Sequence, residues 1–166
     1  MTDSIILSAN KLVKRLGTRD PFQLSEKLGV IVRFADLGNL KGMYTKVKRN
    51  RYILINEGLD DNLQRIICAH ELGHDQRHRK LAENRPLRDF VINQMKEPIE
   101  LEANMYAAEI LFDDDEILEL VDLNYTVEQI AMHTGAYKDL IAIKLALLRH
   151  KGHRLNDIEY NPYFLK

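Results

Sequence analysis

The sequence AHELGH at residues 69–74 places two histidines four positions apart, with a glutamate directly after the first. On an α-helix, residues four apart lie on the same face, so His70 and His74 can present two imidazoles to one metal ion. Glu71 then points about 100° around the helix axis. Two buried histidines in an ordinary helix give the same pattern, and on this segment alone the two interpretations are comparable. The rest of the chain has to decide between them.

The sequence PIELEANMYAAEILF at residues 98–112 supplies a third metal ligand. With about 100° per residue, its apolar residues form one arc whose centre is occupied by Glu100 and Asn104. Glu102 and Glu109 fall on the opposite, polar face. A carboxylate in the middle of a buried face is costly unless a cation or strong hydrogen bonds compensate it. We therefore expect Glu100 to bind the metal and Asn104 to hydrogen-bond a ligating histidine; the alternative is an amphipathic helix with one buried ion pair.

Two histidines, one carboxylate and an open fourth position are typical of catalytic zinc sites. Zinc lowers the pKa of a bound water to about 7, where Glu71 can act as the general base. We expect one Zn²⁺ per chain, although Mn²⁺ and Fe²⁺ also suit these ligands. His78, one turn beyond His74, has three interpretations: a fourth ligand, a hydrogen-bond partner of a ligand, or the favoured one, a partly exposed histidine at the helix end.

The pattern of apolar residues around the motif predicts the α+β class. Before the motif we expect two helices, one strand and a hairpin, at residues 5–16, 21–28, 30–34, 42–47 and 51–56. Asp60 and Asp61 are suitable N-caps for the motif helix. The polar residues 79–96 show no clear periodicity, and Pro98 fits the first position of the next helix.

The C-terminal sequence predicts two helices joined by a tight turn. Thr126 and Gln129 form a capping box, Gly135 marks the turn, and a longer helix covers residues 138–150, which together outline a helix-turn-helix. The exposed arc of that last helix is rich in alanine and has few side chains able to reach base edges. We therefore expect these helices to dock a protein partner and not to bind DNA directly.

The composition is that of an ordinary soluble globular protein. The 166 residues carry a net charge of −1, which leaves no electrostatic footprint for nucleic acid. The single cysteine precludes an intrachain disulfide, and we find neither a signal peptide nor an apolar run of about 20 residues. We expect a cytoplasmic protein without membrane contact, with one domain over residues 1–120 and a helix-turn-helix-like segment over residues 121–166 packed on it.

The sequence INEGLDDNLQRIICAHELGH at residues 55–74, followed by ELEANMYAAEIL at residues 100–111, resembles the ImmA/IrrE family of small metallopeptidases. The resemblance covers most of the chain, and HExxH combined with E-x-x-x-N and alanines is far more specific than HExxH alone. It implies a reduced thermolysin-like zincin, with a small twisted sheet, an active-site helix and a glutamate helix. It also implies that His70, His74 and Glu100 hold the metal, while Glu71 is the general base.

Two positions depart from the pattern of that family. Asp75, with the two residues after it, replaces a segment that is usually apolar, and Asp113 stands where a proline commonly ends the second motif. Neither change removes a ligand.

The resemblance also implies a protein substrate, because family members of known function cleave helix-turn-helix repressors and so relieve gene silencing. An extended substrate can add to an edge strand beside the active-site helix. The residues we expect in that strand are Gly42, Met43, Tyr44, Thr45, Lys46 and Val47. Two other functions remain open: a non-catalytic metal-containing module that docks a partner through its C-terminal helices, and a structural metal site with its fourth position closed.

Overall fold

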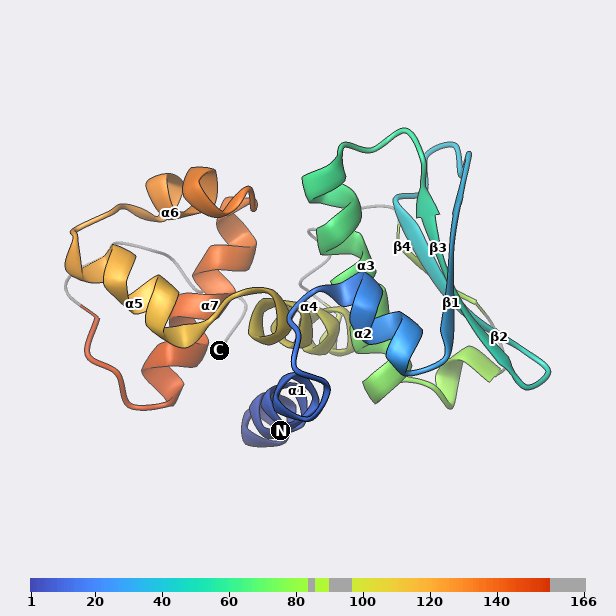
Figure 1. Ribbon diagram of the computed structural model, residues 1–166, viewed down its shortest axis with the longest axis horizontal. Coiled ribbons are helices and arrows are strands. Elements are labelled where there is room, and N and C mark those ends of the chain that lie inside the picture. Colours follow the sequence, from blue (N-terminus) through green and yellow to red (C-terminus); the bar gives the residue numbers. More distant parts are fainter. Residues whose placement is uncertain (84–85, 90–96, 156–166) are drawn as a thin grey trace.

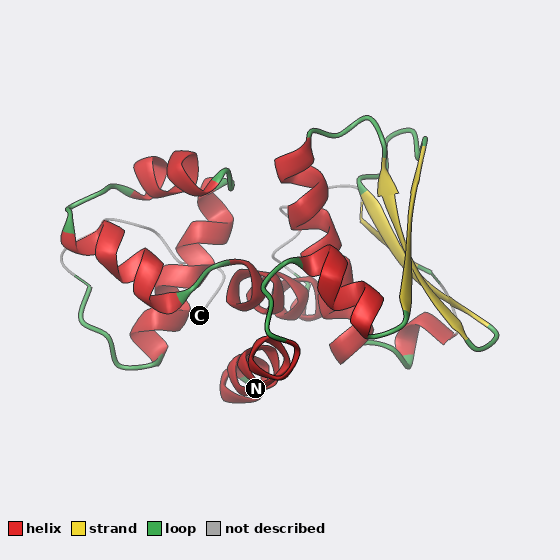
Figure 2. Cartoon of the chain, in the orientation of Figure 1, coloured by secondary structure: helices red, strands yellow, loops and turns green. Residues whose placement is uncertain are grey.

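The computed structural model describes residues 1–83, 86–89 and 97–155. It confirms the mixed α+β class, with one small sheet at one end of the long axis and helices over the rest of the molecule (Figure 2). The elements are α1 (Thr2–Leu16), α2 (Pro21–Lys27), β1 (Val30–Ala35), β2 (Gly42–Val47), β3 (Asn50–Asn56), α3 (Asp61–Arg77), η1 (Leu81–Glu83), β4 (Leu87–Asp89), α4 (Pro98–Leu111), α5 (Asp114–Asp122), α6 (Val127–Thr134) and α7 (Lys138–His150).

The sheet lies at one end of the molecule and has the strand order β1-β3-β2-β4 (Figure 1). β1 runs parallel to β3, whereas β2 is antiparallel to both β3 and β4. The predicted hairpin of β2 and β3 is present, and Lys48 in its turn adopts a positive φ of 56°. The prediction that β2 forms an edge is wrong for residues 42–44, because β4 pairs with them. Only residues 45–47 extend beyond the described partner strand.

α3 packs between the sheet and α4, and its sequence explains where the helix begins and how closely it approaches α4. Asp60 caps the helix by accepting a hydrogen bond from the backbone N–H of Leu63, as one of the two predicted N-caps. Gly73 brings the helices close together, since a Cβ there would lie 2.9 Å from the carbonyl oxygen of Ala103 on α4. The two helices that carry the predicted ligands therefore meet with almost no side chain between them at this point.

α4 lies between the sheet end and the cluster of α5, α6 and α7 (Figure 1). The prediction that Glu109 lies on a polar face is wrong: it is fully buried and pairs with Lys144 of α7 at 3.2 Å and with Lys151 at 2.7 Å. The physical reason is that α4 packs against α1, α3 and α7, so it lacks a solvent face around Glu109. Lys144 is also fully buried and pairs with Asp114 at 2.6 Å.

The predicted ends of α6 are confirmed, but the predicted exposed arc of α7 is wrong. Thr126 and Gln129 form both hydrogen bonds of the capping box, and Gly135 ends α6 with a left-handed φ of 66°. Two alanines of the arc of α7 that we expected to be exposed, Ala142 and Ala146, are only 7% and 8% exposed. The helix-turn-helix geometry and the division at residue 120 stay predictions. None of the described helices combines the length and the apolar character needed to cross a bilayer.

Candidate metal centre

Three side chains from α3 and α4 converge on one point. Nε2 of His70 and Nε2 of His74 are 3.1 Å apart, and Oε2 of Glu100 lies 3.2 Å from the first and 3.5 Å from the second. Around a tetrahedral zinc with ligand distances of about 2.0–2.1 Å, neighbouring ligand atoms are about 3.3 Å apart. In the described part of the chain, these residues form the one cluster of metal-ligating groups. The donor set therefore fits one small divalent ion.

The far side of the His70 ring is held by α4. Nδ1 of His70 lies 2.9 Å from Oδ1 of the buried Asn104. Because a carboxamide oxygen only accepts hydrogen bonds, Nδ1 carries the proton and Nε2 keeps its lone pair facing His74 and Glu100. This is the tautomer that a metal ligand needs, and the predicted neighbour of the ligand is in place.

The charges of the site also suit a cation. Burial lowers the pKa of His74 to about 4, and the neighbouring His70 acts in the same direction, against the effect of Glu100. Burial alone would raise the pKa of Glu100, but its contacts with the two histidine rings outweigh this and hold the pKa well below its usual range. Near pH 7 the site thus presents a neutral His74 and an ionised carboxylate.

Glu71 lies between α3 and the sheet. Its side chain is fully buried, and a Cβ added to Gly42 of β2 would lie 2.7 Å from its Oε1. The same Cβ would lie 2.4 Å from Cγ2 of Ile67, one turn earlier on α3. Gly42 therefore leaves the space that the Glu71 carboxylate occupies.

The prediction that His78 is a partly exposed histidine at the helix end is wrong, because only 7% of it is exposed. Its Nδ1 is 3.0 Å from Nδ1 of His74, on the side of that ring opposite the Nε2 that faces Glu100. It therefore cannot close the fourth position of an ion held by His70 and His74. The structure contradicts the structural-site interpretation in the form that relied on His78.

Asp75 is a buried residue whose importance we did not predict. Its carboxylate accepts hydrogen bonds from Tyr44 at 2.8 Å, Arg51 at 2.8 Å and Arg79 at 3.1 Å. These contacts join α3 to β2 and β3 directly beside the second histidine of the motif. Asp75, which stands where the related family usually has an apolar residue, is thus compensated by hydrogen-bond donors on β2, β3 and the loop after α3, and we did not predict these contacts. Asp113, the second departure, caps α5.

The residues of the predicted substrate strand, β2, point to both faces of the sheet. Gly42 and Tyr44 are buried on the side of Glu71 and Asp75, while Met43, Thr45 and Lys46 are partly exposed and Val47 is exposed. Gly42 is the residue of this set that the structure brings against a predicted catalytic side chain. Because β4 already pairs with residues 42–44, substrate pairing stays a prediction for residues 45–47 of β2.

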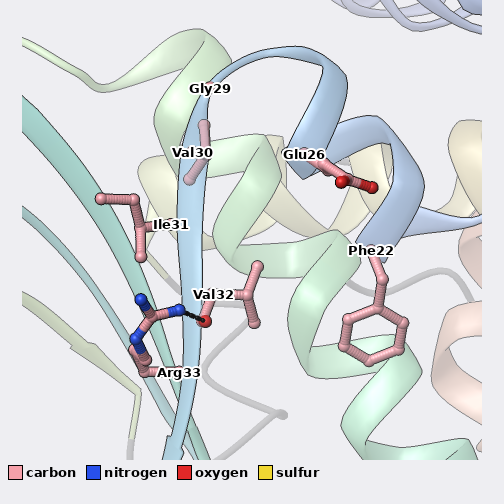
Figure 3. A pocket seen from close by; sticks show the side chains of 7 residues that line it. All are labelled: Phe22, Glu26, Gly29, Val30, Ile31, Val32 and Arg33. Atoms are coloured by element: carbon pink, nitrogen blue, oxygen red, sulfur yellow. Dashed lines mark hydrogen bonds between the residues drawn. The ribbon is translucent and has the colours of Figure 1, made fainter.

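A separate pocket of about 420 Å³ lies between α2 and β1 (Figure 3). Phe22 and Glu26 of α2 line one wall, and β1 lines the other. The guanidinium of Arg33 is turned back to its own strand, where it donates to the carbonyl of Val32 at 2.9 Å. The residues that line this pocket include none of the described metal-ligating cluster of α3 and α4.

Comparisons with known proteins agree with this geometry. The family model described as IrrE N-terminal-like domain (Peptidase_M78) matches residues 25–146, which include all of α3 and α4. The chain is 30% identical over 138 residues to "Uncharacterized immunity region protein 2" of Bacillus phage phi105, covering 82% of this chain and 86% of that protein. It is 24% identical over 156 residues to "Metallopeptidase ImmA" of Bacillus subtilis (strain 168), covering 92% and 90%. The chain belongs to the Peptidase_M78 family of proteins with an IrrE N-terminal-like domain, as its two motifs predicted.

Proposed function

We propose that this chain is a zinc-dependent, site-specific endopeptidase of the cytoplasm that cleaves a helix-turn-helix repressor and so relieves gene silencing. The observation that carries the proposal is the convergence of His70, His74 and Glu100, together with the buried Glu71 that follows His70 in the motif. The name of one relative, a metallopeptidase, supports the reaction, and the phage immunity region in the name of the other supports a role in genetic control.

In this proposal His70, His74 and Glu100 hold the ion, and Asn104 holds the His70 ring in the tautomer that binds it. A bound zinc ion supplies Lewis-acid chemistry, which makes a water molecule acidic enough to lose a proton near pH 7. Glu71 accepts that proton as the water oxygen attacks the peptide carbonyl carbon. Glu71 then gives the proton to the departing nitrogen as the C–N bond breaks.

The proposed substrate segment is an extended peptide that pairs with the sheet next to α3. β4 covers residues 42–44, so the peptide uses the outer side of β4 and residues 45–47 of β2. Because backbone pairing discriminates poorly between sequences, the repressor must also dock elsewhere on the protein. We assign docking to α6 and the start of α7, where Met132 is 84% exposed beside a pocket of about 520 Å³.

That exposed region also supports the second candidate, a non-catalytic module that binds a partner through its C-terminal helices. The variant Glu71→Gln separates the two functions because it removes proton transfer and leaves the three ligands in place. We expect the wild type to make one discrete cut in the helix-turn-helix regulator encoded beside it, and to digest casein negligibly. Glu71→Gln should cut about 10²–10⁴-fold more slowly while retaining its zinc.

The exposed Glu119 provides a matched control, since Glu119→Gln makes the same chemical change far from α3. This control should cut at the wild-type rate. Zinc content would be measured by atomic emission and cleavage by gel electrophoresis. Cutting by Glu71→Gln at the wild-type rate, or a wild type without a divalent ion, would refute the peptidase mechanism.

A further inference from the structure

A row of polar side chains continues behind His74, away from the converging ligand atoms. Nδ1 of His74 lies 3.0 Å from Nδ1 of His78, and Nε2 of His78 lies 3.6 Å from Oε2 of Glu102. Both histidines are buried. Arg77 donates from Nε and Nη2 to the same oxygen of Glu102, each at 3.3 Å, and so fixes its carboxylate beside His78.

The positions of these atoms determine which nitrogen carries each proton. Oε2 of Glu102 faces Nε2 of His78, and an ionised carboxylate accepts but cannot donate a hydrogen bond. The separation of 3.6 Å is longer than a hydrogen bond, yet an N–H dipole in this buried position is attracted to the carboxylate, whereas a lone pair would be repelled. Nε2 of His78 has no closer hydrogen-bond partner in the described part of the chain. The proton of neutral His78 therefore lies on Nε2.

The proton on His78 then decides the state of the metal ligand. With Nε2 protonated, Nδ1 of neutral His78 is an acceptor, so the short contact between the two Nδ1 atoms requires that His74 donates. The remaining nitrogen of His74, Nε2, can then offer its lone pair to an ion held together with Glu100 and His70. This is the same ligand tautomer that Asn104 imposes on His70 from the other side.

We propose that His78 and Glu102 are positioning residues that fix the tautomer and orientation of His74 for metal binding. The metal-binding part of this inference rests on the proposed function, because an ion at the site is what requires the free lone pair on Nε2. The proton assignment of His78 itself rests only on the atoms described above. Hydrogen-bond partners of ligand histidines commonly change metal affinity by about 10–100-fold when they are removed.

Two substitutions at His78 separate positioning from simple space filling. The amide oxygen of His78→Asn can take the place of the imidazole Nδ1 and accept the same proton from His74. His78→Leu fills a similar volume without an acceptor. In competition with a zinc-binding dye at about pH 8, where imidazoles are neutral, we expect His78→Asn to stay within about 3-fold of the wild type. His78→Leu should bind zinc about 10–100-fold more weakly while keeping its far-UV circular dichroism.

The exposed His133 serves as the control, and His133→Leu should leave the zinc affinity unchanged. Wild-type affinity in a folded His78→Leu variant, or an equal loss in both His78 variants, would overturn the proposal.

A second measurement reads the tautomers directly. Long-range ¹H–¹⁵N correlation spectra of the zinc-bound wild type report which ring nitrogen is protonated. Zinc has to be present, because without it the Glu100 carboxylate, 3.5 Å from Nε2 of His74, attracts a proton to that nitrogen. We expect the proton of His74 on Nδ1 and that of His78 on Nε2, with assignments taken from the His78 variants. The opposite tautomers, or an even mixture, would overturn the inference. If the wild type binds no divalent ion, the proposed function fails; if it binds zinc but the proton of His78 lies on Nδ1, only this inference fails.

Discussion

The substitution Gly42→Ala tests how closely α3 packs on β2 at the predicted general base. The added Cβ would lie 2.4 Å from Cγ2 of Ile67 and 2.7 Å from Oε1 of Glu71. Carbon atoms in contact prefer separations of about 3.5–4.0 Å, so Ile67 has to retreat by roughly 1 Å within a fully packed helix face. Overpacking of this kind costs about 1–3 kcal/mol of the free energy of unfolding. The Glu71 carboxylate has to move by roughly 0.7 Å to reach ordinary contact, and because a misplacement of about 1 Å can cost about 10²-fold, we expect the proposed cleavage to slow by up to about 10²-fold.

Urea unfolding followed by circular dichroism measures the first effect, and repressor cleavage measures the second. Gly58→Ala is the matched control, because its Cβ would lie 3.4 Å from Oδ1 of Asn56, which is ordinary contact. We expect this control to change the free energy of unfolding by less than about 0.5 kcal/mol. Zinc content should be unaffected in both variants, since neither alters a ligand. If Gly42→Ala matched Gly58→Ala in stability and in cleavage rate, the close packing of Glu71 on Gly42 would be refuted.

Three further predictions concern the buried charges. Lys144→Met deprives the buried Glu109 of one partner and should lower the free energy of unfolding by about 3 kcal/mol. The control Lys138→Met breaks only an exposed ion pair and should leave the urea midpoint almost unchanged. Equal shifts of the urea midpoint in the two variants would contradict this prediction. Glu100→Gln should lose its zinc on dialysis, and wild-type zinc content measured by atomic emission would remove Glu100 from the ligand set. In the metal-free protein the pKa of His74 is lowered to about 4, so between about pH 6.5 and 4 the unfolded chain binds a proton that the folded chain does not. The free energy of unfolding should therefore decrease as the pH is lowered from about 6.5 to 4, by up to about 1.4 kcal/mol per pH unit from this group. A urea midpoint that stays constant over this range would disprove the prediction.

The sequence predicted those features that depend on short spacings within one element. Pro98 begins α4, and the capping box of Thr126 begins α6, because both signals act through hydrogen bonds or sterics within one helical turn. His70, His74 and Glu100 were found because helical periodicity places each on a buried face, and two such faces that pack together bring their polar residues to one point.

The features that sequence reasoning missed depend on contacts between distant elements. β4 has three residues, too few for an alternating pattern, and without it β2 was taken for an edge. The burial of Glu109 requires a lysine 35 residues away on α7, which no helical period reveals. His78 continues the row of His70 and His74 at a spacing of four, and that regular spacing was the available signal for its place behind His74.

The buried ion pairs of α4 limit how this protein can be rearranged by recombination. Glu100 lies in the first turn of α4 and Glu109 near its last, so the helix that bears a proposed metal ligand also bears the acid that Lys144 and Lys151 neutralise. A chimera that takes α7 from a relative must import a cation at the position of Lys144, or it leaves the buried carboxylate of Glu109 with Lys151 as its remaining cationic partner. If a partner docks on α6 as we propose, new partner specificity is therefore more easily acquired by point changes on α6 than by exchange of the whole C-terminal segment.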